Sequence, residues 1–129
     1  MQKSSQFLQS LFDKVNFYSS EFNKGLSEWQ EGKFDNKTVI QKTNDYILTL
    51  KDIGTELENF TPTKEYIPIF QSYLKSINSE IDGHKHFVKY LETGNSKENE
   101  TSVDLYSKAY DYEQQTIGEF NRLNSELMN

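Results

Sequence analysis

Residues 36–60, NKTVIQKTNDYILTLKDIGTELENF, place a core-compatible side chain at every third or fourth position. The inward set comprises Val39, Thr43, Tyr46, Ile47, Leu50, Ile53 and Leu57. This spacing matches the 3.6-residue period of an amphipathic helix that turns one face to a core. Asp35 supplies an N-cap before the stretch, and Pro62 drives Thr61 out of the helical region after it. The sequence therefore predicts a helix over residues 36–60.

The same period recurs on both sides of this segment and predicts helices over residues 4–31, 63–93 and 96–127. The inward stripe of the last helix is expected to comprise Val103, Tyr106, Ala109, Tyr110, Glu113, Ile117, Phe120, Asn124 and Leu127. Because the connections are short, consecutive helices must be neighbours. The predicted fold is all-α, a single-domain antiparallel up-down-up-down four-helix bundle over residues 1–129.

Breaks in the apolar pattern coincide with residues that end or restart helices. Gly32 and Gly94 can adopt the left-handed conformation that closes a helix at its C-terminus. Pro68 lies inside the third predicted helix, where it lacks a donor, so we expect a kink or a restart there. The helical wheel places Gly83 toward solvent.

Composition narrows the classes of function. The chain has 129 residues, a formal net charge of -6 and 14% aromatic residues. No cluster of Lys and Arg overcomes the acidic background, so we expect no nucleic-acid partner. No apolar run approaches the length of a transmembrane helix. The absence of Cys excludes disulfides, thiolate metal sites and cysteine nucleophiles.

Two histidines provide the candidate metal ligands. Glu80 and His84 are spaced four residues apart and share a helix face, whereas His86 points elsewhere. One Glu-x-x-x-His pair falls short of the ligand set of a di-iron bundle, so we expect neither a metal nor another cofactor. We expect His84 to be hydrogen-bonded near Tyr106, Thr43 or Trp29. No catalytic motif occurs, and the chain is not expected to be an enzyme.

Glu113 is the ionisable residue that stands out, because it falls at the centre of its apolar stripe. A carboxylate buried there without partners would have a raised pKa. Tyr18 and Tyr46 come at about the same level on the first two helices, so their hydroxyls are predicted to join Glu113 in a buried polar layer. Such a layer fixes helix register, whereas a functional interpretation makes Glu113 a general acid or a ligand anchor.

Two apolar residues fall on the outer faces of the predicted helices. Phe17 lies about 150° from the centre of its stripe, and Leu48 is displaced similarly. In a hairpin that turns near Lys33 they come at matching heights. They form a candidate contact patch for a protein partner, against the alternative of incidental exposure.

Several segments of the second half resemble small helical-bundle domains of unknown function that are the mature parts of Gram-positive lipoproteins or secreted proteins. The likeness is carried by Thr61-Pro62-Thr63-Lys64-Glu65-Tyr66, His84, Tyr90-Leu91-Glu92-Thr93-Gly94-Asn95 and Ser107-Lys108-Ala109. The resemblance implies a proline opening the third helix and a location outside the cytoplasm. A lipid anchor would then lie outside this chain, at the outer face of the membrane. The resemblance supplies no catalytic residues.

Three hypotheses of function follow. The first is a non-enzymatic extracytoplasmic interaction or structural module. The second is a ligand-binding or enzymatic bundle with its site near Glu113 and His84. The third is a cytoplasmic regulatory or immunity-type protein that blocks a partner through an acidic helical face.

Overall fold

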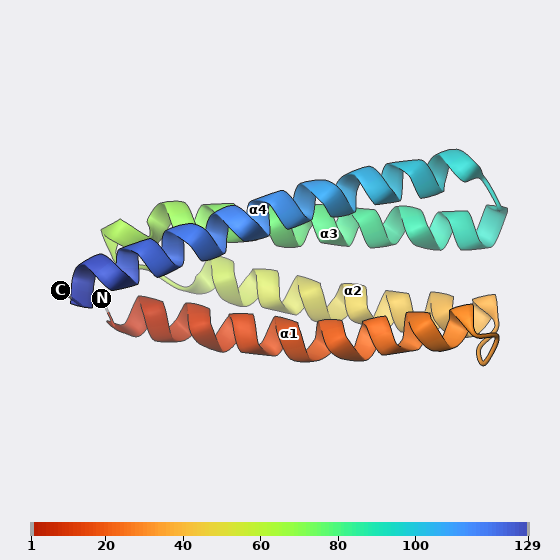
Figure 1. Ribbon diagram of the computed structural model, residues 1–129, viewed down its shortest axis with the longest axis horizontal. Helices are drawn as coiled ribbons and strands as arrows, with labels where there is room; N and C mark the ends of the chain where they lie inside the picture. The colour runs from red at the N-terminus through yellow and green to blue at the C-terminus, as the bar shows by residue number, and fades with distance from the viewer. Residues whose placement is uncertain (1, 129) are drawn as a thin grey trace.

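The structure is a computed structural model that describes residues 2–128, and within that range it contains helices and no strand (Figure 1). Its elements are α1 (Gln2–Gln30), α2 (Asn36–Asn59), the 3₁₀ turn η1 (Lys64–Tyr66), α3 (Ile67–Thr93) and α4 (Ser96–Met128). The prediction of an all-α fold built from four long helices is confirmed. Figure 1 shows α1 beside α2 and α3 beside α4, with all four helices running along the long axis.

The connections use the capping chemistry that the sequence carries. The carboxylate of Asp35 accepts a hydrogen bond of 2.8 Å from the backbone amide of Thr38. The side chain of Thr38 and this backbone bond together lower the pKa of Asp35. Gly32 and Gly94 have φ angles of 82° and 72°, in the left-handed region that glycine occupies without strain. The amide of Gly94 also bonds to the carbonyl of Tyr90, which closes α3.

The third predicted helix is divided at its start. Residues Lys64–Tyr66 form a 3₁₀ turn, and α3 begins at Ile67 with Pro68 in its first turn. A proline is tolerated there because the first turn of a helix has no backbone acceptor for its N–H groups. This restart is the outcome expected at Pro68. The side chain of Ser4 accepts a hydrogen bond of 3.0 Å from the amide of Thr63, which ties the start of α1 to this connection.

The core runs along the inner faces of the helices and is rich in aromatic rings. Phe7, Phe60 and Phe70 stack in one layer, with centroids 4.1 Å apart for Phe7 and Phe60. The fully buried aliphatic positions include Leu8, Leu50 and Ile53. All seven inward residues predicted for α2 are buried, namely Val39, Thr43, Tyr46, Ile47, Leu50, Ile53 and Leu57. The helical period of this segment therefore identified its buried face correctly.

Small side chains form the contact between α3 and α4. Ser76 donates a hydrogen bond of 2.8 Å to the carbonyl of Ala109, and Ser102 donates one of 2.9 Å to the carbonyl of Gly83. A Cβ atom added to Gly83 would lie 2.7 Å from two ring carbons of Tyr106. Gly83 is therefore buried in a close helix contact, and the prediction that it faces solvent is wrong.

The buried face of α4 differs from the predicted stripe. The buried residues of α4 are Ser102, Ala109, Thr116, Phe120 and Leu123. Of these, Ser102, Ala109 and Thr116 are spaced by seven and hydrogen-bond to α3. Within the predicted stripe, Val103, Tyr110, Ile117 and Leu127 are exposed. The buried face is thus turned by roughly 60° from the predicted orientation, since each residue advances a helix by about 100°. The physical reason is that small and hydroxyl-bearing residues allow backbones to approach closely, whereas a search for bulky apolar residues ignores them.

Candidate ligand-binding cleft

The seam between α1 and α4 is less closely packed than the contacts between consecutive helices, α1–α2, α2–α3 and α3–α4. The backbone of α4 lies near α3 along much of its length but approaches α1 at few positions. At one end the seam is closed, because the hydroxyl of Ser5 donates to Asn124 at 3.2 Å and the rings of Phe12 and Phe120 meet edge to face. Beyond this end two cavities, of about 210 and about 400 Å³, share Glu113 in their walls. We call these adjoining cavities the α1–α4 cleft.

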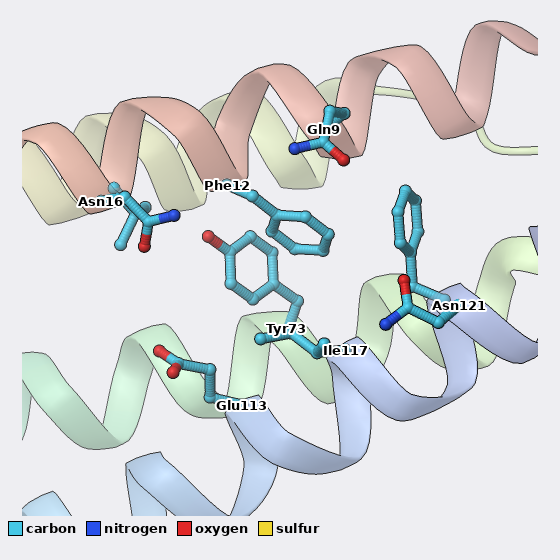
Figure 2. Close-up of a pocket in the computed structure, with 9 residues that line it drawn as sticks. Gln9, Phe12, Asn16, Tyr73, Glu113, Ile117 and Asn121 are labelled. Atoms are coloured by element: carbon cyan, nitrogen blue, oxygen red, sulfur yellow. The ribbon is translucent and has the colours of Figure 1, made fainter.

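The smaller cavity lies nearer the closed end of the seam. Figure 2 shows Asn16 on α1 facing Tyr73 on α3, with Glu113 on α4 below them. Burial raises the pKa of Tyr73 above its ordinary value, and the nearby carboxylates of Glu113 and Glu80 raise it further. The remaining lining residues are Gln9, Phe12, Val15, Ile117, Phe120 and Asn121.

The larger cavity is lined by all four helices. Part of its wall is His84, whose ring makes two hydrogen bonds. The buried ring of His84 places Nδ1 2.7 Å from the hydroxyl oxygen of Tyr106 and Nε2 3.1 Å from a carboxylate oxygen of Glu80. A carboxylate accepts hydrogen bonds, so the neutral imidazole satisfies both contacts when Nε2 donates to Glu80 and Nδ1 accepts from Tyr106. The other lining residues are Ser19, Phe22, Asn23, Leu26, Tyr46, Ala109, Tyr110 and Glu113.

Tyr46 contributes a polar atom to this wall that finds no partner. The residue is 5% exposed, and its hydroxyl is buried without a hydrogen bond to any described group. Burial raises the pKa of Tyr46, with a further contribution from the carboxylate of Glu80. Ser19 and Glu80 are the polar neighbours that influence this hydroxyl, and both line the larger cavity.

Glu113 lies where the two cavities meet and is half-buried. Burial raises the pKa of its carboxyl group, and the charge of Glu80 raises it further. No Lys or Arg occurs among the lining residues of either cavity in the part of the chain that the structure describes. The cleft therefore holds two carboxyl groups with no Lys or Arg in its wall, and one of them, Glu80, pairs with His84.

The structure separates the residues predicted for the buried polar layer. Glu113 and Tyr46 both line the larger cavity, although no hydrogen bond joins these two described side chains. Tyr18 is 40% exposed, and its prediction as a member of the layer is wrong. Its ring contacts Phe17 at the outer edge of α1, and it lines a separate shallow groove that includes Asp45. The apolar stripe of α1 is narrower than predicted on this side.

Sequence reasoning did not assign Glu80 and Tyr73 to the same site as Glu113. The spacing of Glu80 and His84 by four residues was the signal available for Glu80. A count of helix rise separates Glu113 and His84 by about 12 Å, yet a cavity along the seam is long enough to include both. Only the openness of the α1–α4 seam, which depends on the rotation of α4, brings them into one wall.

Phe17 and Leu48 are exposed to 61% and 60%, on the outer faces of α1 and α2. The ion pair of Lys14 with Glu56 and the stacking of Phe22 on Tyr46 fix the relative heights of the two helices. They place Phe17 level with about residue 52, roughly 6 Å along the axis from Leu48. The two residues are thus offset by about one turn, and their role as a contact patch stays a prediction.

Neither a metal site nor a membrane span is found in the described range 2–128. No group of three His, Asp or Glu residues there is placed to hold a metal ion. His86 pairs with Glu98 on α4 and is separate from the bonds of His84. No described helix is both long and apolar enough to cross a membrane.

Comparison with known proteins finds no similar protein. No family model, curated protein or solved structure matches the chain. The resemblance to domains of Gram-positive lipoproteins stays a prediction. Function is therefore inferred from the geometry of the α1–α4 cleft.

Proposed function

We propose that the chain is a non-enzymatic binding module that takes a small ligand in the α1–α4 cleft. The observation that carries this proposal is the buried, unpartnered hydroxyl of Tyr46, a residue that lines a cavity of about 400 Å³. A buried hydroxyl without a partner costs roughly 1 to 3 kcal/mol, so a ligand that bonds to it recovers free energy. The volume lies within the range of small-molecule sites.

The packing of the bundle supports this role. The predicted antiparallel up-down-up-down threading agrees with the contacts, because residue numbers fall along α2 as they rise along α1, and α3 and α4 behave likewise. In this arrangement α4 is held by α3 through small residues, while α1 is held mainly by α2. The two walls of the cleft thus belong to different helix pairs, and a ligand can enter without disrupting either pair.

A fragment titration followed by two-dimensional NMR tests the proposal. Fragments of positive, neutral and negative charge are added to the wild-type chain, and we expect shifts of Ser19, Tyr46 and Tyr106 with at least one of them. Asn23→Trp places a large ring in the larger cavity and should abolish those shifts. Asn44→Trp introduces the same ring on the exposed face of α2 and should leave them.

Two results would contradict this function. One is the absence of any shift at the cleft with every class of fragment. The other is an equal loss of binding in Asn23→Trp and Asn44→Trp, which would show that the ring acts on the fold rather than on the cavity.

Partner binding at Phe17 and Leu48 is a second candidate function, favoured by the exposure of both side chains. It corresponds to an extracytoplasmic interaction module, with a lipid anchor supplied by sequence outside this chain. A gene whose reading frame encodes a leader ending in Leu-x-x-Cys before Met1 would support it. A native start at Met1 would instead favour the cytoplasmic regulatory or immunity-type alternative.

A further inference from the structure

We propose that the larger cavity binds an organic cation, a protonated amine carried on a small apolar body. This inference rests on the proposed function and adds the chemical class of the ligand. Three features of the cavity converge on it: two carboxyl groups with no Lys or Arg beside them, a set of aromatic rings, and a buried hydroxyl that can accept a hydrogen bond.

The charge of the cavity favours a cation. Glu80 and Glu113 both line it, and neither Lys nor Arg is present among its lining residues. One carboxylate oxygen of Glu80 accepts from His84, which leaves the second oxygen without a hydrogen bond to any described group. An ammonium group placed between the two glutamates would relieve their mutual repulsion, whereas an anion would increase it.

Aromatic rings form the remainder of the wall. Phe22, Tyr46 and Tyr106 surround His84, with ring centroids 5.0, 5.1 and 5.0 Å from the imidazole. Tyr110 also lines the cavity and is 61% exposed, which places it at the mouth. The negative faces of such rings attract cations within about 6 Å and pack against an apolar body.

The hydroxyl of Tyr46 sets the depth at which the ammonium would sit. A phenolic oxygen accepts hydrogen bonds, and this one is buried beside Ser19 and Glu80 without a partner. A primary ammonium carries three donors, enough for Tyr46 and for the carboxylates of Glu80 and Glu113. A bare metal ion fits less well, because no described trio of His, Asp or Glu residues can surround it.

Calorimetric titration with three probes of similar shape tests the inference. The probes are 2-phenylethylammonium, the neutral 2-phenylethanol and the anionic 3-phenylpropionate. We expect the ammonium to bind at least about tenfold more tightly than the alcohol, since a charge-assisted hydrogen bond contributes more than a neutral one. We expect no binding of the carboxylate.

Variants of the two carboxylates locate the charge that is responsible. Glu80→Gln and Glu113→Gln should each weaken binding of 2-phenylethylammonium by about tenfold. The matched control is Glu100→Gln, which removes the same charge from an exposed position of α4 and should leave the affinity within about twofold. Equal weakening in all three variants would show a general charge effect and would overturn the assignment of the cavity.

Tyr46→Phe separates a ligand contact from a structural one. Removing the unpartnered hydroxyl should raise the thermal midpoint of the free protein while it weakens binding of 2-phenylethylammonium by about tenfold. A raised midpoint with unchanged affinity would show that the hydroxyl does not meet the ammonium.

The two levels of the proposal fail in different ways. If 2-phenylethanol or 3-phenylpropionate binds the cleft as tightly as the ammonium, the cation assignment is overturned and the ligand-binding function stands. If no probe and no fragment perturbs the cleft, both are overturned.

Discussion

The two long faces of α4 pack against their neighbouring helices in opposite ways. Toward α3 the helix presents small residues, and hydroxyl groups such as those of Ser76 and Ser102 bond across the contact to backbone carbonyls. Toward α1 it presents bulky residues such as Tyr110 and Ile117, which α1 leaves exposed. The first face is close-packed and its polar groups are satisfied. The second encloses a cleft that contains a buried hydroxyl without a partner.

The side of α1 that faces the cleft explains the difference. Half of its lining positions are polar, namely Gln9, Asn16, Ser19 and Asn23. Such side chains cannot interlock with the bulky apolar stripe of α4 as an apolar helix would, because burial of their amides without partners is costly. Packing of α4 is therefore determined by α3, and the more apolar face of α4 remains available.

The strongest test of the comparison is a pair of glycine substitutions. Gly83→Ala puts a Cβ atom 2.7 Å from the ring of Tyr106, which is itself bonded to His84. Overpacking should exceed the gain in helix propensity and lower the free energy of unfolding by about 1 to 2 kcal/mol. Urea unfolding measures the change.

Gly118→Ala is the matched control, because nothing lies within 4 Å of a Cβ atom added there. It should raise the free energy of unfolding by about 1 kcal/mol through helix propensity. If both variants stabilise the protein to the same extent, the α3–α4 contact is not as close as the structure shows.

Hydroxyl bonds across the close contact allow a second test, in which the contrast between variant and control is smaller. The hydroxyl of Thr116 is buried, 2.7 Å from the carbonyl oxygen of Tyr112 and 3.0 Å from the hydroxyl of Ser72. Thr116→Val keeps the shape but removes these bonds, and it should lower the free energy of unfolding by about 1 to 2 kcal/mol. Chemical denaturation of the two proteins gives the value.

Exposed Thr55 makes the same kind of bond to the carbonyl of Lys51 and serves as the control. Thr55→Val should change the free energy of unfolding by less than about 0.5 kcal/mol, since water replaces the lost bond. Similar costs at Thr116 and Thr55 would mean that burial of the α3–α4 hydroxyls contributes nothing.

The comparison also shows what the sequence could predict. The period of bulky residues located all seven inward positions of α2, and Asp35, Gly32 and Gly94 marked helix ends through local backbone chemistry. The rotation of α4 was not predictable in this way. Its buried face includes Ser102, Ala109 and Thr116, and such residues carry little apolar signal even where they are fully enclosed.

The same limitation affected the candidate site. Glu113 and Tyr46 were recognised individually, since each falls on an inward stripe of its own helix. Their placement in one cavity with Glu80 depends on which helix covers α4, and this is a tertiary property that a single stripe does not encode. The prediction that Tyr18 is buried was wrong for a related reason. Tyr18 lies at the edge of its apolar stripe, where a small rotation of the helix moves a side chain from the core to solvent.

The smallest expected effect is a pH dependence on the cleft face of α4. Glu113 shares the cleft wall with Glu80, His84 and Tyr73 on α3 and with Tyr46 on α2, and the cleft-lining residues of α1 are uncharged. Burial and Glu80 raise the pKa of Glu113 in the folded protein above its ordinary value of 4.5. A raised pKa means that the folded state holds this proton more tightly than the unfolded state.

The contribution of Glu113 to stability is therefore fully present below pH 4.5 and is lost as the pH rises through the raised pKa. Glu113→Gln keeps a neutral side chain at every pH, so its thermal midpoint should match that of the wild-type protein near pH 4 and exceed it near pH 7. Glu100→Gln, at an exposed position of the same helix, should show no such divergence. If the difference in thermal midpoint between Glu113→Gln and wild type stays constant across this range, the ionised carboxylate is not destabilised by the cleft. The cleft face would then be as well satisfied as the face against α3, and the contrast between the two would rest on packing alone.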